Sequence, residues 1–202
     1  MKSSRLELLF PTPVLFTNIE RSFTEAEWAV FNALEFRQNS GNRISTNTYV
    51  LNDPALASLR AEILEVSRKF FQDVYKPLPS VELYITQSWI NKTNQGEYHH
   101  THTHGNSIVS GSLYIQTVES DSITYHRTLQ PQINIDSTEF NQFNSKSWWY
   151  PVQTGDVSVF PSTVMHGVDV VESAGTRITL AFNTFIRGQL TVDGTLNELT
   201  IG

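Results

Sequence analysis

Apolar residues recur every three or four positions in the first third of the chain, which is the spacing of helices that bury one face. Ser22 and Glu25 have the spacing of a capping box, so we expect a helix of about three to four turns after them. A second helix is expected to begin near Asn52-Asp53-Pro54, where a cap residue precedes proline. Both helices are interpreted as packing elements. Their apolar faces are Trp28, Phe31 and Leu34 in the first, and Leu56, Leu59, Ile63, Val66, Phe70 and Val74 in the second.

Beyond Pro79 the pattern changes to alternating apolar and polar residues that are rich in β-branched and aromatic side chains, which predicts strands. Turn signals such as Gly155-Asp156 separate them, as in a sandwich, barrel or jelly roll. A polar, aperiodic stretch over 129–146 predicts a long loop, and a final hairpin is expected after Gly188. Strands are expected over 81–91, 108–117, 123–126, 148–151, 157–160 and 177–186.

The fold class predicted from these patterns is mainly β (α+β). A helical part over about 1–78 is expected to pack on a β core over about 79–202. A length of 202 residues fits one domain, and 39% hydrophobic with 17% charged residues is typical of globular proteins. We therefore expect a single domain over 1–202.

Charge and cysteine content narrow the classes of function. A net charge of −6 without a Lys/Arg cluster argues against nucleic-acid binding. The absence of cysteine excludes disulfides, thiolate nucleophiles and thiolate-bound metals, which leaves His, Asp and Glu as the strong metal ligands. No signal-peptide pattern opens the chain and no apolar run of about 18 residues occurs, so we expect a cytoplasmic protein that does not act at a membrane.

Five of the six histidines are placed in a way that suggests a metal site: a run of His99, His100, His102 and His104, and the later His166. In an extended chain, alternate members of the run point to one face about 6.5–7 Å apart, and His99 points away. His100 and His104 would be about 13 Å apart, too far to share a metal unless the chain turns. A turn at Gly105-Asn106 favours His102 with His104. A solvated loop or an incidental metal binder remains the plain alternative, and His126 is interpreted as structural or substrate-facing.

Two of the predicted strands carry a polar face. Ser110, Ser112 and Tyr114 share one face of the first, and Arg177, Thr179, Ala181 and Asn183 share one face of the second. If these faces are interior, they suit a barrel that holds a small polar ligand, and a buried Arg177 would need an anionic partner such as a carboxylate. If they are exterior, Arg177 is simply a solvated residue.

As an ordered set, these residues resemble the 2-oxoglutarate and iron(II)-dependent dioxygenase superfamily. More narrowly they resemble its poorly characterised branch from bacteria and phages, with prolyl-hydroxylase-like features. The set is His102-Thr103-His104, Ser110-Gly111-Ser112-Leu113-Tyr114, Gly155-Asp156, Phe160-Pro161, His166-Gly167-Val168, and Arg177 with Ala181-Phe182-Asn183. The opening Leu9-Phe10-Pro11-Thr12-Pro13-Val14 is similar to that branch as well.

The resemblance implies a double-stranded β-helix jelly roll in which His102, His104 and His166 hold iron(II). It implies that Arg177, with Tyr114 and Asn183, binds the cosubstrate 2-oxoglutarate. The reaction implied is decarboxylation to succinate and carbon dioxide, coupled to hydroxylation of a C–H bond by dioxygen. The substrate would be a small molecule or a peptide side chain, in the cytoplasm of a bacterium or of a phage-infected host cell. The oligomeric state, a homodimer included, is left open.

One position departs from the family pattern, because His104 stands where the superfamily usually has Asp or Glu. Three explanations are open. They are an all-histidine triad, a pair shifted to His100 and His102, and a carboxylate recruited from Glu97 or Asp169.

Two other classes of protein are weighed against the oxygenase. One is a cupin-like metal protein that does not use 2-oxoglutarate, and the other is a jelly-roll interaction module without catalysis. Arg177 discriminates, because a metal-only cupin has no need of an interior cation.

Overall fold

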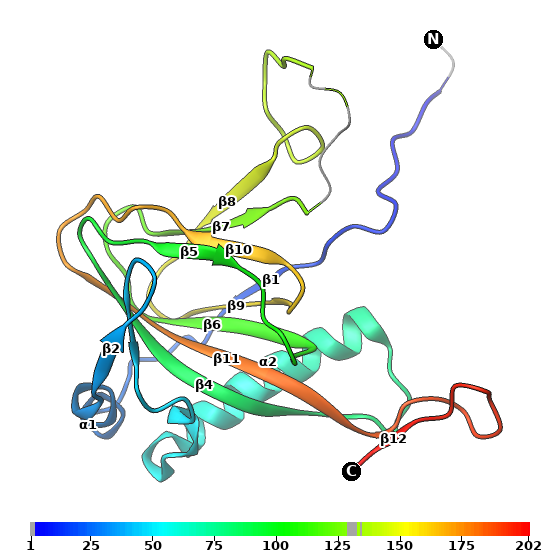
Figure 1. Ribbon diagram of the computed structural model, residues 1–202, viewed down its shortest axis with the longest axis horizontal. Coiled ribbons are helices and arrows are strands. Elements are labelled where there is room, and N and C mark those ends of the chain that lie inside the picture. The colour runs from blue at the N-terminus through cyan, green and yellow to red at the C-terminus, as the bar shows by residue number, and fades with distance from the viewer. Residues whose placement is uncertain (1–2, 129–132, 134) are drawn as a thin grey trace.

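Two antiparallel sheets face each other, and a long helix covers the outer face of the larger sheet (Figure 1). The computed structural model describes residues 3–128, 133 and 135–202. The architecture is the jelly roll that the sequence predicts. In spatial order the larger sheet contains β1 (Leu15–Asn18), β9 (Asp156–Pro161), β6 (Val109–Gln116), β11 (Thr176–Gln189), β4 (Glu82–Asn94), β3 (Arg43–Ser45) and β2 (Phe36–Gln38). The smaller contains β5 (His99–His102), β10 (Met165–Val168), β7 (Ser122–His126) and β8 (Ser147–Pro151).

The first helix, α1 (Glu25–Ala33), begins two residues later than the sequence interpretation placed it. Its capping box is formed by Thr24 and Glu27, so the prediction of Ser22 with Glu25 is wrong. Both pairs have the required spacing, but Glu27 is also buried and paired with Arg21, at 2.8 Å between Nη2 and Oε1. This second contact decides which acidic residue folds back on the helix start.

The second helix, α2 (Ala57–Tyr75), is preceded by two short 3-10 turns, Val50–Asn52 and Pro54–Leu56. Asp53 caps the second turn with Pro54 in its first position, so the predicted start signal is used by this turn. The predicted stripe is largely buried, but Val74 in the last turn is exposed. Phe71 is buried instead, which ends the packed face one turn earlier than predicted.

The part of the chain before residue 79 is not purely helical. The strands β1, β2 and β3 all lie in it, and they extend both edges of the larger sheet. They have only three or four residues each, which is too short for alternation to be recognised. The short strands β5 and β10 were missed for the same reason.

The two faces of the larger sheet differ in polarity. Leu113, Leu180 and Phe182 pack toward α2, in one hydrophobic core with its Leu59 and Ile63. The opposite face of β4, β6 and β11 carries polar side chains toward the smaller sheet. Of the two alternatives that the sequence left open, the interior polar face is the one observed, and Arg177 on that face is 3% exposed.

The remaining expectations concern the loop and the end of the chain. Residues 129–132 and 134 of the predicted loop lie outside the described residues, and 133 with 135–146 contain no helix or strand. The final hairpin is confirmed, since β12 (Thr200–Ile201) pairs with Gly188 and Gln189 of β11. Among the described helices, none is both long and apolar enough to cross a membrane.

Candidate metal centre

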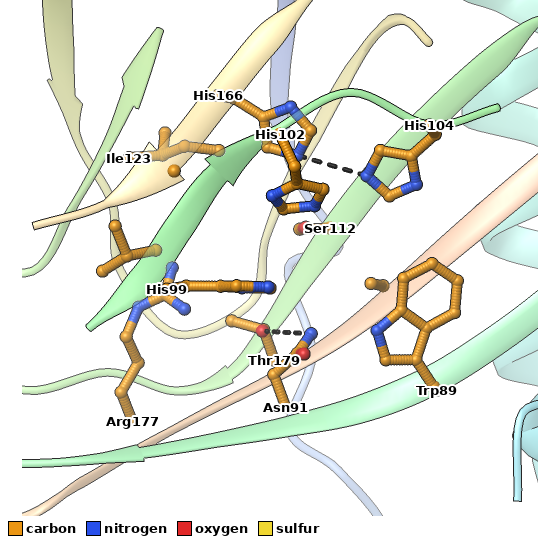
Figure 2. A pocket seen from close by; sticks show the side chains of 13 residues that line it. Trp89, Asn91, His99, His102, His104, Ser112, Ile123, His166, Arg177 and Thr179 are labelled. Carbon is orange, nitrogen blue, oxygen red and sulfur yellow. Dashed lines mark hydrogen bonds between the residues drawn. The ribbon is translucent and has the colours of Figure 1, made fainter. Parts of the chain in front are cut away.

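A pocket lies between the two sheets, and the histidines on one wall face polar residues on the other (Figure 2). The wall on the side of the smaller sheet contains His99, His102, Ile123, His166, Gly167 and Val168, and His104 from the segment that follows β5. The larger sheet contributes Trp89, Asn91, Ser112, Arg177, Thr179 and Ala181.

His102 and His166 lie directly opposite each other on the antiparallel strands β5 and β10. The Nδ1 atom of His102 is 2.8 Å from the carbonyl oxygen of His100, and that of His166 is 2.9 Å from the carbonyl oxygen of Val164. Because a carbonyl can only accept, each Nδ1 carries the hydrogen and each Nε2 presents a lone pair to the pocket. This is the arrangement that orients histidines bound to metals.

His104 reaches the same place from beyond the end of β5. The backbone N–H of His104 donates to Ser162 at 2.9 Å, and a turn follows in which Asn106 has a left-handed φ of 54°. The predicted turn is therefore confirmed. The imidazole of His104 stacks on Trp89 at 5.7 Å between ring centroids, and its Nε2 lies 3.2 Å from Nε2 of His166.

The spacing of the three imidazoles matches that of ligands around one metal ion. Two imidazoles bound at right angles through bonds of about 2.1 Å have nitrogens roughly 3.0 Å and ring centroids roughly 4.6 Å apart. The centroid distances are 4.6 Å for His102–His166, 5.0 Å for His102–His104 and 5.1 Å for His104–His166. The ligand atoms of all three lie within 4.8 Å of one another. The three imidazoles therefore fit one metal ion that they would bind from the same side.

Burial keeps these histidines uncharged. It lowers the pKa of His166 to about 3 and that of His104 to about 4, with the neighbouring imidazoles adding to the effect. It also lowers the pKa of His102. A neutral imidazole is the form that binds a metal, so little proton release has to accompany binding near neutral pH.

Arg177 lies on the opposite wall, close to His99 (Figure 2). Its Nε donates to Oδ1 of the buried Asp121 at 2.8 Å, and its Cζ is 5.1 Å from the ring centre of Tyr114. Among the residues that the structure describes, neither terminal guanidinium nitrogen has a hydrogen-bond partner. The guanidinium is thus fixed through one nitrogen and has two left to offer to a ligand.

Comparison with known proteins identifies this arrangement. Residues 87–183, which span β4 to β11, match the family model described as "Putative 2OG-Fe(II) oxygenase". Over these residues, which include the pocket histidines and Arg177, the chain is similar to this family. The match and the site together assign an oxidoreductase that uses iron(II) and 2-oxoglutarate. No curated protein matches it.

Solved structures of oxygenases share the fold of this chain. A 2OG-Fe(II) oxygenase family oxidoreductase from Burkholderia pseudomallei has a TM-score of 0.58 at 15% identity, over 85% of this chain and 83% of its own. HygX from Streptomyces hygroscopicus, with nickel, 2-oxoglutarate and hygromycin B bound, has 0.57 at 16%, over 86% and 82%. The carbocyclase SnoK from nogalamycin biosynthesis has 0.56 at 15%, over 88% and 83%.

The two carboxylates that could replace a histidine in the triad of this oxygenase are engaged elsewhere in the structure. Glu97 accepts from the backbone N–H of Asn94 at 2.7 Å, and Asp169 accepts from the Thr124 hydroxyl at 2.8 Å. Neither carboxylate belongs to the histidine groups that could hold a metal. His100 lies outside the pocket lining, with its Nδ1 3.3 Å from the carbonyl oxygen of Ser40.

One orientation predicted for this oxygenase is wrong. His99 was expected to point away from the metal, yet it lines the pocket and stacks on His102 at 4.7 Å. The cause is a β-bulge. His102 pairs with His166 and His99 with Val168, so β5 has one residue more than β10 between these pairs, and the alternation of side chains is interrupted.

The other predicted cosubstrate residues of the oxygenase lie next to the pocket rather than in its lining. Tyr114 is fully buried behind Arg177, with its hydroxyl 3.4 Å from Oγ of Ser158, and burial raises its pKa to about 12. Asn183 acts to raise the pKa of His104 against the larger effect of burial, and its Oδ1 accepts from Ser110 at 2.8 Å. His126 lies at the end of β7, with Nε2 3.3 Å from the Thr101 hydroxyl. Asp121 was missed, because nothing in its local sequence marks it as the partner of Arg177.

Proposed function

We propose that His102, His104 and His166 hold iron(II) through their Nε2 atoms, and that Arg177 binds the far carboxylate of 2-oxoglutarate. One observation carries this proposal: three imidazole nitrogens converge on one wall of a pocket, and a buried, partly unpaired guanidinium stands on the opposite wall. Three protein ligands on one face leave positions for the cosubstrate and dioxygen.

The bound iron, 2-oxoglutarate and dioxygen would supply the oxidation of a substrate C–H bond, with release of succinate and carbon dioxide. The protein supplies position and electrostatics. The carbonyl contacts at Nδ1 orient His102 and His166, and Asn183 orients His104. Asp121 and the ring of Tyr114 hold Arg177, so in this proposal Tyr114 and Asn183 support the groups that bind cofactor and cosubstrate.

The substrate class is a small polar molecule or a peptide side chain, with hydroxylation as the reaction. The pocket floor supports a polar substrate, because Asn91, Ser112 and Thr179 line it. The Oδ1 atom of Asn91 is buried and has no hydrogen-bond partner within the described part of the chain, so it can accept from a substrate O–H or N–H. The structure of HygX with hygromycin B bound supports a small molecule by analogy.

The test is anaerobic addition of iron(II) and 2-oxoglutarate to metal-free protein, with the visible charge-transfer band as the readout. The wild type and the control His126→Ala should develop the band. His166→Ala should abolish it, and Arg177→Ala should require far more 2-oxoglutarate. No band in the wild type at saturating ligand would refute the proposed site. Iron binding without a 2-oxoglutarate band would fit the cupin-like alternative, and a band that is unaffected by Arg177→Ala would mean that Arg177 does not hold the cosubstrate.

A further inference from the structure

The bulge in β5 brings together a second group of imidazoles next to the first. The ring centroids of His99, His100 and His102 are 4.7 to 5.2 Å apart. Their ligand atoms all lie within 4.8 Å of one another. Ligands of one metal ion are expected at such distances, and the agreement is as good as in the first group. We call His102, His104 and His166 the inner trio, and His99, His100 and His102 the outer trio.

The nitrogens of the outer trio are available to a metal. His100 and His102 each have Nδ1 at a carbonyl oxygen, which leaves Nε2 as the ligand atom. The ring of His99 has no hydrogen-bond partner among the residues that the structure describes, so its nitrogens are free to bind a metal.

The two trios share His102. Since the Nδ1 of His102 is engaged by the carbonyl of His100, both trios depend on the same Nε2 atom, and one nitrogen binds one metal. We propose that the outer trio is a second divalent-metal site that excludes occupation of the inner trio. The proposal rests on the proposed function, because it takes the inner trio as the site of the catalytic iron.

The chemistry of the outer trio selects the class of metal. Three neutral imidazoles without a carboxylate or thiolate suit borderline ions such as zinc, cobalt and nickel, and they disfavour magnesium and calcium. The outer trio is also the more accessible group, since none of its members is fully buried whereas His166 is 6% exposed. A metal held there leaves the inner site with only His104 and His166. Excess zinc is therefore expected to inhibit by holding His102 away from iron.

Cobalt(II) is the appropriate probe, because its visible spectrum reports the ligand set. Metal-free full-length protein would be titrated with cobalt, and the bound equivalents would be measured by equilibrium dialysis. The wild type should bind one equivalent tightly. The double variant His104→Ala/His166→Ala should still bind one equivalent, with a different spectrum. His99→Ala/His100→Ala should bind one equivalent with the inner spectrum, and His126→Ala should match the wild type.

His102→Ala removes a ligand from both trios and sets the baseline, with affinity at least about a hundredfold below that of the wild type. The inference is overturned if His104→Ala/His166→Ala binds no better than His102→Ala, or if the wild type binds two equivalents tightly at once. Should the double variant unfold, His104→Gln carries the same expectation. The proposed function fails separately, if the wild type forms no charge-transfer band with iron(II) and 2-oxoglutarate.

Discussion

The buried ion pair between Arg177 and Asp121 can be dissected by replacing its members singly and together. Both side chains are almost inaccessible, at 3% and 2% exposure, and Oδ2 of Asp121 has no hydrogen-bond partner in the described residues. Arg177→Leu therefore leaves a buried carboxylate without compensation, which costs about 3–5 kcal/mol of unfolding free energy. The double variant Arg177→Leu/Asp121→Leu removes both charges, and it should regain most or all of that stability. Urea unfolding of the metal-free proteins, followed by tryptophan fluorescence, measures both effects.

Binding of 2-oxoglutarate should respond differently from stability. Each charge-assisted hydrogen bond to a carboxylate contributes about 1.5–3 kcal/mol, and two terminal guanidinium nitrogens are free to form one each. Losing both should weaken 2-oxoglutarate by at least about 3 kcal/mol, or more than roughly a hundredfold. The loss should be equal in the single and the double variant, because both lack Arg177. Titration of the anaerobic charge-transfer band gives the affinity.

Two results would refute this reasoning. If the double variant binds 2-oxoglutarate as tightly as the wild type, Arg177 does not hold the cosubstrate and its role is confined to the ion pair. If the single variant is as stable as the double variant, the carboxylate of Asp121 is solvated and the pair is not buried in solution.

Three further predictions concern the cap, the histidines and the bulge. Thr24→Ala should lower the unfolding free energy by about 1 kcal/mol in urea, whereas Ser22→Ala should leave it unchanged, since only Thr24 caps α1. The metal-free protein should lose stability as the pH falls from about 6.5 toward 3. Burial holds the folded pKa of His166 at about 3, so the unfolded chain takes up the proton first, and His166→Gln should flatten the urea midpoint against pH. Gly167→Val should lower cobalt affinity at least tenfold. A Cβ at this position would lie 3.0 Å from the His99 carbonyl oxygen, so the bulge must shift and the histidines with it. Unchanged affinity would contradict this.

The parts of the fold that were predictable are those with enough residues to show a period. The stripe of α2 and the alternation in β4, β6 and β11 each extend over eight or more residues. The short strands of the larger sheet, β1 to β3, have three or four residues. β1 and β3 pair with strands that are distant in the chain, and β2 joins the sheet through β3. Their existence depends on tertiary contacts that local sequence does not encode.

The site was predictable in its residue types and less so in its geometry. The polar faces of β6 and β11 were compatible with an interior cation, and the run of histidines was compatible with a metal site. The direction of His99 depends on the bulge, which is set by pairing with β10. Asp121 is separated from Arg177 by 56 residues, and only the packing of the sheets brings the two together.

The position of Asp121 bears on the missing carboxylate among the metal ligands. In the usual triad, iron(II), one ligand carboxylate, the arginine and the 2-oxoglutarate dianion sum to zero charge. With His104 in place of the carboxylate the ligand set is neutral, and the same sum would leave one positive charge uncompensated in a buried pocket, which is costly. The buried Asp121 restores the balance from the opposite wall. Under the proposed function, this chain has therefore moved the negative charge from the metal to the arginine. The metal then keeps its full double charge toward 2-oxoglutarate, while Arg177 contributes chiefly directional hydrogen bonds.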